Sequence, residues 1–585
     1  MKTRSPRRLS RVEEAFARFS AGERLVLYGL SVVLTISAFS LLAYANAAVS
    51  VTVPALGGTF VEGEVGPARF INPIISLSQS DDDMANLVYS GLTRALPDGS
   101  IVPDLSQSYD VSEDGTTYTF KLRGNAKFHD GSPVTSADIL YTVQSAQNSA
   151  IKSPRRADWE GVLVSAPDAE TVVFKLPHAY APFIENTTLG ILPKHLWENV
   201  SPEEFPFSPL NTHPVGSGPY KISSLTTDGS GSATRYDLTI FKNFALGKPY
   251  LGHITLKFYS NDEAMIRAFN AREIDALARI SPAKISELKR SDVRILHVPL
   301  PRIFAVFYNQ NHNPALADLS ARAALEAAVD TEHIVHTVLY DYGVPLGGPI
   351  PPGVLADSVP TNSNASSTSA TNAGATSTPI ATARSILTRG GWKFDDKSGV
   401  WKNKKLTLSL TLATADEPEL LATANEVAES WRAIGVKVDV HVYPLQELNT
   451  SILRPRSYDA ILFGEVVGRA LDLFAFWHSS QRLDPGLNLA LYTNSKADSL
   501  LSQARATTDP KERVKLYRSF EQVVEKDHPA LFLYAPEFIY VVPSSLQGIA
   551  LGALTSPGER YLNIHEWYID TERVWNIFSN QSQPQ

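Results

Sequence analysis

Three Asp-Gly pairs divide the stretch between Val88 and Tyr141 into short segments, and this pattern limits the possible folds more than any other feature of the chain. The pairs Asp98-Gly99, Asp114-Gly115 and Asp130-Gly131 each separate runs of apolar or alternating residues. In that setting Asp-Gly is a strong signal for a tight turn, because glycine readily takes the positive φ that hairpin turns require. The stretch is therefore expected to form short paired strands joined by turns.

A strand and a helix start are predicted around the second and third turns. Tyr118, Phe120 and Leu122 alternate with polar residues, as they do in a strand with one buried face. After the third turn, Thr135 or Ser136 can cap the helix that follows.

The block YSGL, followed by DGSIVPDLSQSYDVSEDGTTYTFKLRGNAKFHDGSPVTSADILYT, resembles the signature of the extracytoplasmic solute-binding proteins of the peptide/nickel type, family 5. Weaker matches to the same family continue in order from about Gly57 to Tyr568. The resemblance implies two α/β lobes that close on a ligand like a clamshell, of the type II periplasmic-binding-protein kind, with an extra accessory subdomain. It implies a small solute, a peptide or peptide-like compound, and the permease and ATPase subunits of an ATP-driven importer as partners. In the family this block forms the accessory subdomain, so it marks ancestry and not the binding site.

Length and composition agree with a folded protein of several domains. The chain has 585 residues, which predicts two or three domains, and its 43% hydrophobic and 19% charged content is ordinary for a globular protein. The net charge of -8 gives no basis for nucleic-acid binding. The absence of cysteine excludes disulfides, thiolate metal sites, cysteine nucleophiles and the lipid anchor that needs a cysteine at its processing site.

A stretch near the N-terminus is long and apolar enough to cross a membrane. Residues 25–45 carry no charge, and about 20 residues suffice to span the hydrocarbon core. Seven basic residues precede this stretch, whereas only Arg69 and Arg94 lie between it and Asp98, which predicts a cytoplasmic N-terminus and an extracytoplasmic main part. We expect an uncleaved single-pass anchor. Cleavage as a signal peptide after the small-x-small sequence at Ala45 to Ala47 is the alternative.

Three motifs that could suggest catalysis or metal binding are better explained otherwise. Asp81 to Asp83 stand where a helix begins and are expected to complement its dipole. His333 and His336 lie three apart on a predicted helix with no third ligand nearby in the sequence, so a surface or packing role is expected. Ser217 lies between two glycines, but residue 215 is valine where a nucleophile elbow needs glycine. We therefore expect no catalytic residues, no metal and no cofactor.

The ligand is expected beside the segment that follows the strand Tyr458 to Gly464. In peptide-binding members of the family this segment contains two aspartates, of which the first pairs with the α-amino group of the peptide. On a gap-free match Arg469 replaces the first aspartate and Asp472 takes the second. An arginine disfavours an ammonium and binds a carboxylate or phosphate through two parallel hydrogen bonds. Either the ligand is not an ordinary free-amine peptide, or the loop is shifted and Glu465 or Asp472 supplies the negative charge.

Other residues are expected at the cleft because their motifs resemble segments that lie there in the family. This group comprises Phe463 and Trp477, the strand end at Tyr308 and Asn309, and Gly218 and Tyr220 of the PVGSGPY turn. Trp477, like its neighbour Phe474, could equally belong to the core.

The expected organisation follows from these assignments and from a low-complexity insert rich in Ser, Thr, Asn and Ala, which cannot bury a core. The segments are a cytoplasmic basic segment 1–24, an anchor 25–45, lobe I in three parts (56–92, 213–300 and 529–568), an accessory subdomain 93–212, lobe II 301–528 with the insert at 358–380, and a polar tail 569–585. The expected function is solute capture for an importer. A membrane-tethered ligand sensor and an extracytoplasmic hydrolase are the alternatives.

Overall fold

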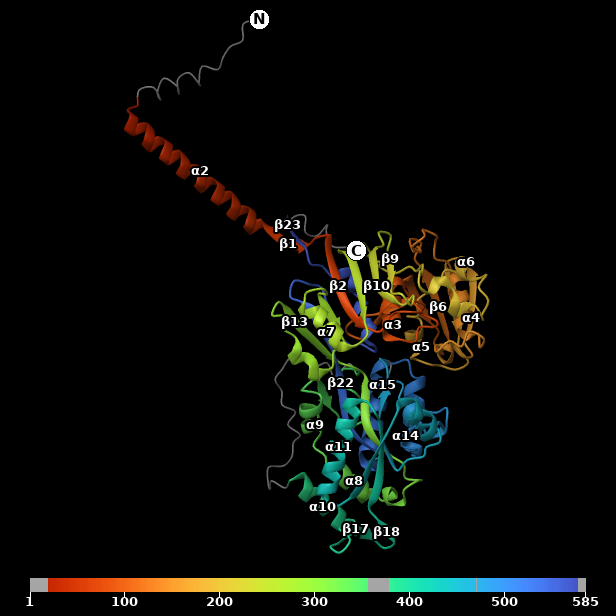
Figure 1. Ribbon diagram of the computed structural model, residues 1–585. Coiled ribbons are helices and arrows are strands. Elements are labelled where there is room, and N and C mark those ends of the chain that lie inside the picture. Colours follow the sequence, from red (N-terminus) through yellow and green to blue (C-terminus); the bar gives the residue numbers. More distant parts are fainter. Residues whose placement is uncertain (1–18, 356–377, 470, 577–585) are drawn as a thin grey trace. The chain divides into compact units, whose positions relative to one another are not determined.

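The structure is a computed structural model that describes residues 19–355, 378–469 and 471–576 (Figure 1). Most of the predicted insert and of the basic N-terminal segment lies outside the described residues. The described chain forms two compact units. One consists of residues up to Leu56 together with those from Tyr568 onward, and the other runs from Gly57 to Trp567.

The smaller unit contains one long apolar helix and a pair of strands. Helix α2 (Ala21–Val49) starts at a capping box between Ser20 and Glu23 and includes the whole predicted span 25–45. It is long and apolar enough to cross a membrane. After it, β1 (Ser50–Pro54) pairs antiparallel with β23 (Thr571–Trp575). The C-terminal segment expected as a polar tail therefore contains a strand.

The larger unit is organised on one mixed sheet. Along the sheet the strand order is β20-β19-β21-β14-β22-β12-β2-β11-β10-β9, with β13 and β15 also paired to β22. Their bounds are β2 (Gly57–Val65), β9 (Tyr220–Thr227), β10 (Ala233–Ile240), β11 (Leu251–Tyr259), β12 (Ala276–Ala278), β13 (Val293–Pro299), β14 (Arg302–Tyr308), β15 (Gly343–Pro345), β19 (Ser409–Ala415), β20 (Lys437–Tyr443), β21 (Ala460–Val466) and β22 (Ala530–Pro543).

Strand β22 belongs to both lobes. Its first residues pair with β14 of lobe II, and its last residues pair with β12 and β13 of lobe I. Twelve of its 14 residues are buried, which explains its almost continuous apolar sequence. The long strand labelled β22 in Figure 1 accordingly runs from one lobe into the other.

Helices cover the lobe II part of the sheet and bury one continuous hydrophobic core (Figure 1). The core includes the amphipathic faces of α8 (Leu319–Ala327), α9 (Thr331–Val338), α10 (Pro379–Arg389), α11 (Pro418–Ala433), α14 (Ser495–Ala506) and α15 (Pro510–Asp527). Helix α11 joins the parallel strands β19 and β20 through a turn at Gly435, whose φ of 95° suits glycine. Because α10 begins at Pro379, the structure ends the predicted insert before that residue.

The accessory subdomain confirms the predicted turns. The pair Asp98-Gly99 joins β3 (Thr93–Ala95) to β4 (Ile101–Pro103), and Asp114-Gly115 joins β5 (Ser106–Val111) to β6 (Thr117–Leu122). Strand β6 lies between β5 and β8 (Thr171–Lys175), and β7 (Leu163–Asp168) completes this sheet. Tyr118, Phe120 and Leu122 are buried as expected, and Thr135 precedes α4 (Ser136–Gln147) in a capping box.

The remaining elements are short. In lobe I they include α3 (Gln79–Val88) and α7 (Asp262–Asn270), and α5 (Phe183–Asn186) and α6 (Lys194–Trp197) follow the accessory sheet. In lobe II they are α12 (Leu445–Glu447), α13 (Phe474–Trp477) and the small sheet of β16 (Lys393–Asp395), β17 (Val400–Asn403) and β18 (Leu406–Thr407).

Candidate functional site

The predicted site lies where the central strands of lobe II end. Strands β14 and β21 run antiparallel along their whole length, with Arg302 opposite Val466. The chain then enters residues 467–473, of which residue 470 lies outside the described residues. We call this segment the specificity loop because the sequence predicts a solute-selecting residue in it. Its first amide donates to the carbonyl of Pro301, and Gly468 and Leu471 both have positive φ. The loop therefore leaves the sheet in a fixed direction at the boundary between the lobes.

Arg469 of the specificity loop binds lobe I. Its Nη2 donates to Oε2 of Glu559 at 2.6 Å and to the carbonyl of Ala553 at 2.9 Å. The Arg469 side chain is 8% exposed and that of Glu559 is 19% exposed, so water screens this ion pair weakly. The backbone amide of Thr555 also donates to the Glu559 carboxylate, at 2.6 Å. The guanidinium at the predicted specificity position thus already has a carboxylate partner.

Asp472, at the other end of the loop, binds the accessory part and lobe II. Its Oδ2 accepts from the hydroxyl of Tyr180 at 3.2 Å and lies 3.1 Å from Nη2 of Arg505. The Arg505 guanidinium also lies over the rings of Tyr180 and Phe474, at 5.0 and 4.6 Å from their centroids. Burial raises the pKa of Asp472, and the charge of Arg505 opposes that rise.

A second carboxylate accompanies the Arg469–Glu559 pair. Burial, together with the negative charge of Glu559, raises the pKa of Glu185 to about 7, while Arg469 and Arg513 act to lower it. Glu185 belongs to α5, so it comes from a third part of the chain. No local motif marks these partners, so the sequence alone did not predict Glu559, Glu185, Tyr180 or Arg505 as site residues.

Glu465 lies on β21 opposite Ile303 and is buried within lobe II. Neither of its carboxylate oxygens has a hydrogen-bond partner among the described residues. Burial disfavours the charged form and raises the pKa of Glu465 well above its ordinary value. Phe463, two residues earlier on the same face of β21, is half-buried.

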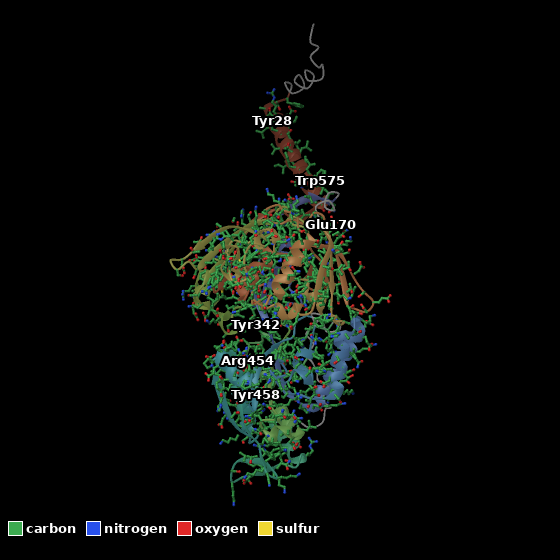
Figure 2. The ribbon with its side chains drawn as sticks, turned by 90° about the vertical axis from the view of Figure 1, so that its right-hand side faces the viewer. Tyr28, Glu170, Tyr342, Arg454, Tyr458 and Trp575 are labelled. Atoms are coloured by element: carbon green, nitrogen blue, oxygen red, sulfur yellow. The ribbon has the colours of Figure 1, made fainter. Side chains whose placement is uncertain are left out.

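Several other predicted site residues lie inside the lobes. Tyr308 and Trp477 are fully buried in the lobe II core, where Trp477 lies 5.7 Å from the Phe532 ring. Asn309 donates to the carbonyl of Arg456 and accepts two backbone amides, which fixes the chain after β14. Tyr458, which stands just before β21, lies in lobe II (Figure 2). It is likewise buried and donates to the carbonyl of Leu489 at 2.6 Å.

Gly218 and Tyr220 hold the PVGSGPY turn against lobe I. The amide of Gly218 donates to the carbonyl of Val88 at 2.8 Å, and a Cβ at this residue would lie 2.6 Å from that carbonyl carbon. Glycine is therefore required by this close approach of two backbone segments. Tyr220 is buried and donates to the carbonyl of Leu251 at 3.1 Å.

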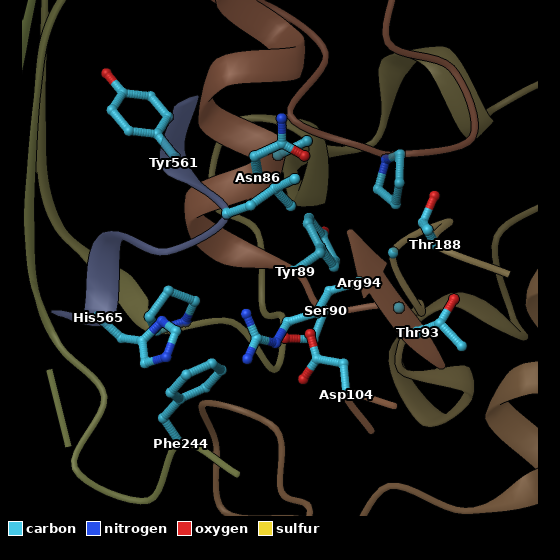
Figure 3. A pocket seen from close by; sticks show the side chains of 16 residues that line it. Asn86, Tyr89, Ser90, Thr93, Arg94, Asp104, Thr188, Phe244, Tyr561 and His565 are labelled. Atoms are coloured by element: carbon cyan, nitrogen blue, oxygen red, sulfur yellow. The ribbon is translucent and has the colours of Figure 1, made fainter. Parts of the chain in front are cut away.

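A small polar cavity of about 70 Å³ lies at the end of α3 and is lined by residues of both lobe I and the accessory subdomain (Figure 3). Arg94 and Asp104 point into it, with His565 and Phe244 on another side. Burial raises the pKa of Asp104 to about 7, against the effect of Arg94, and lowers that of His565 to about 4. The hydroxyl of Tyr89, Nε of Arg94 and Oδ1 of Asp104 have no partner among the described residues. A cavity of this size suits ordered water, which would satisfy these groups.

A buried charge cluster fixes the short helix that carries Glu559. Arg560, the next residue, is fully buried and donates to Glu62 at 2.9 Å and to Asp83 at 2.9 Å. Arg279 lies 3.1 Å from Asp83, so the guanidinium groups of both Arg560 and Arg279 pair with carboxylates of this cluster. Asp81 accepts the backbone amides at the start of α3 and of the preceding loop, as predicted for a helix N-terminus.

No group of three or more His, Cys, Asp or Glu side chains within the described ranges has the arrangement of a metal site. His333 instead lies 3.8 Å from Glu426, and His336 lies 2.9 Å from Asp341.

Comparisons with known proteins agree with this architecture. The family model described as "Bacterial extracellular solute-binding proteins, family 5 Middle" matches residues 100–483. The oligopeptide-binding protein AppA of Bacillus subtilis is 26% identical over 557 residues, which are 93% of this chain and 97% of AppA. The structure of AppA in complex with a nonapeptide has a TM-score of 0.65 at 25% identity and covers 88% of this chain and 100% of that chain.

Two further solved structures share this fold. NikZ from Campylobacter jejuni, in complex with Ni(L-His), has a TM-score of 0.66 at 26% identity and covers 87% of this chain and 99% of its own. The substrate-binding protein CtaP from Listeria monocytogenes has a TM-score of 0.72 at 25% identity and covers 88% and 100%. The family match extends over more than half of the sequence and includes most of the accessory block and the specificity loop. The chain belongs to the bacterial extracellular solute-binding proteins of family 5.

Proposed function

We propose that the protein is the extracytoplasmic solute-binding component of an ABC-type importer and captures peptides or peptide-like solutes. The observation that carries this proposal is the similarity to AppA over nearly the whole of both chains, since AppA binds a nonapeptide in its solved structure. The proposal treats the protein as a binding protein and not as an enzyme.

The sheet that the two lobes share would allow the protein to capture a solute by closing one lobe against the other. Because β22 is shared by the two lobes, a small change in its backbone between residues 535 and 537 would rotate one lobe against the other. The specificity loop extends from β21 of lobe II and contacts both lobe I and the accessory part. A solute enclosed there would meet Arg469, Asp472 and the half-buried Phe463.

The positive charge of Arg469 in the specificity loop supports the binding of a solute with an acidic group. Arg469 offers a guanidinium that can hold a carboxylate or phosphate through parallel hydrogen bonds. Asp472 is already bound by Arg505 and Tyr180, and Glu465 is buried with a raised pKa, so neither is a favourable partner for an ammonium in this arrangement. We therefore propose that Arg469 recognises an anionic group of the solute.

Helix α2 would attach the binding unit to the membrane, with the N-terminus in the cytoplasm and the permease and ATPase subunits as partners. Its length and apolar composition support this proposal. Washing membranes of expressing cells with alkaline carbonate tests it. An uncleaved anchor stays in the membrane with residues 1–24 still attached, whereas cleavage after Ala47 gives a soluble chain with a new N-terminus.

Native mass spectrometry of the full-length chain, purified gently in detergent, tests the function. Incubation with a mixture of tripeptides should give complexes with one intact peptide per chain. Peptide products shortened by cleavage would instead identify a hydrolase. A membrane-tethered sensor would bind the same peptides but would not support their uptake by cells.

A further inference from the structure

The specificity loop carries two charged side chains, and each is bound by another part of the protein. Arg469 pairs with Glu559 of lobe I, and Asp472 binds Tyr180 from the accessory part. The loop itself belongs to lobe II, so these contacts join three parts of the chain. In a protein that closes its lobes on a solute, contacts between the parts that move determine how far the lobes close when no solute is bound.

The partner of Arg469 is held in place as firmly as Arg469 is. Glu559 accepts the backbone amide and the hydroxyl of Thr555, which lies four residues before it. The next residue, Arg560, is fixed in the buried cluster with Glu62 and Asp83. A carboxylate held in this way keeps its position toward Arg469 and loses little side-chain freedom when the pair forms.

Glu559 contacts Arg469 with the geometry expected for the carboxylate of a bound acidic solute. An oxygen of a carboxylate lies 2.6 Å from Nη2 of Arg469, in a largely buried setting. This is the distance expected for a strong charge-assisted hydrogen bond between a guanidinium and the carboxylate of a solute. The Nε of Arg469 has no partner among the described residues, so part of its donor capacity is unused.

We propose that Glu559 is an internal counterion that occupies Arg469 when no solute is bound, and that an acidic solute must displace it. Glu559 is then a specificity-determining residue. It brings the lobes together without a ligand, and it excludes solutes whose acidic group binds Arg469 too weakly to replace it. This inference rests on the proposed solute-binding function, whereas its effect on closure can be measured without any solute.

A pair of variants separates the two roles of the ion pair. Glu559→Gln and Arg469→Gln both break the pair, but only Glu559→Gln leaves the guanidinium free for a solute. Glu566→Gln is the matched control, since Glu566 lies seven residues further on and its side chain is 56% exposed. Because the chain contains no cysteine, thiols introduced at the exposed residues Lys242 of lobe I and Lys437 of lobe II can be labelled selectively.

The first measurement is energy transfer between these two labels in the full-length chain without solute. Both Glu559→Gln and Arg469→Gln should lower the transfer efficiency, because the lobes separate more often, and Glu566→Gln should leave it unchanged. Equal efficiencies in all four proteins would overturn the proposal, whatever the protein binds.

The second measurement is the affinity for N-acetyl-trialanine, which has a free carboxylate and no ammonium, and for its C-terminal amide. Glu559→Gln should bind the acid at least about tenfold more tightly than the natural chain, because the competing carboxylate is gone. Arg469→Gln should show no such gain in affinity for the acid. The C-terminal amide should bind to Glu559→Gln and to Arg469→Gln with equal affinity. A gain that is the same for acid and amide would refute displacement at Arg469. If neither peptide binds to any variant, the proposed peptide function fails for these solutes, and the transfer measurement still decides the role of Glu559.

Discussion

Replacing Arg560 by methionine should destabilise lobe I strongly, because this side chain balances a buried group of carboxylates. Arg560 is fully buried and hydrogen-bonds to Glu62 and Asp83, each at 2.9 Å, and to Glu64 at 3.3 Å. Burial and the nearby Asp83 raise the pKa of Glu64 well above its ordinary value, which favours the neutral form of this side chain. The charges of Glu62 and Asp83 then face those of Arg560 and Arg279, and the cluster is balanced.

Without Arg560, Arg279 alone faces two buried carboxylates. Removing one partner from a buried ion pair costs about 3–5 kcal/mol, because an uncompensated charge is left without water. The matched control is Arg235→Met on β10 of the same lobe. Arg235 lies 2.6 Å from Asp237, but its side chain is 47% exposed, so the loss should stay below about 1 kcal/mol.

The assay is urea unfolding of the full-length chain at pH 7, followed by tryptophan fluorescence. Trp567, whose ring lies 5.9 Å from that of Tyr561, reports on this part of lobe I. The free energy of unfolding should fall by about 3–5 kcal/mol in Arg560→Met and by much less in Arg235→Met. Equal losses in the two variants would refute the argument that the cluster depends on Arg560.

The pH dependence gives a second check. In the natural chain burial favours protonation of Asp83, but Arg560 and Arg279 outweigh it and hold its pKa below the ordinary value. Its contribution to stability is therefore present above the ordinary pKa and is lost as the pH falls through the lowered one. In Arg560→Met the carboxylates instead take up protons more readily. The difference between the two proteins should thus shrink as the pH is lowered toward 4.

Three further predictions concern the site and the insert. Arg469→Asp should shift binding from acidic solutes toward solutes with a free amine, because the introduced carboxylate and Glu559 would then both favour an ammonium, and unchanged selectivity in a peptide panel would exclude this role. Glu185→Gln should stabilise the protein by about 1–2 kcal/mol at pH 8 but hardly at pH 4, because the pKa of about 7 means that folding opposes ionisation of Glu185 as the pH rises; equal melting curves at pH 8 would contradict this. Deleting residues 362–377, which contain few large apolar side chains, should leave the melting temperature and solute binding nearly unchanged, and a large cooperative loss of stability would show that the segment packs against the fold.

The sequence was sufficient to predict features that depend on neighbouring residues. The Asp-Gly turns, the buried face of β6 and the cap before α4 all follow from residues a few positions apart. The order of these local motifs also carried the family resemblance, which supplied the two-lobe architecture.

The partners of the charged site residues could not be predicted in this way. Arg469 and Glu559 are 90 residues apart, Tyr180 and Asp472 are 292 apart, and Arg560 and Glu62 are 498 apart. Contacts of this kind exist only after the lobes have folded and met. The strand β23 was missed for a related reason, because a short strand of mixed polarity is recognised only through its pairing with β1.

Native mass spectrometry of the full-length protein, purified from cells that supply its natural solutes, can show whether the protein captures peptides. The account predicts one bound molecule per chain that is released intact and fragments as a peptide or as an acidic peptide-like compound. Release of cleaved products from added peptides, or no bound mass after incubation with a broad mixture of peptides, would contradict the claim that this protein captures peptides for import.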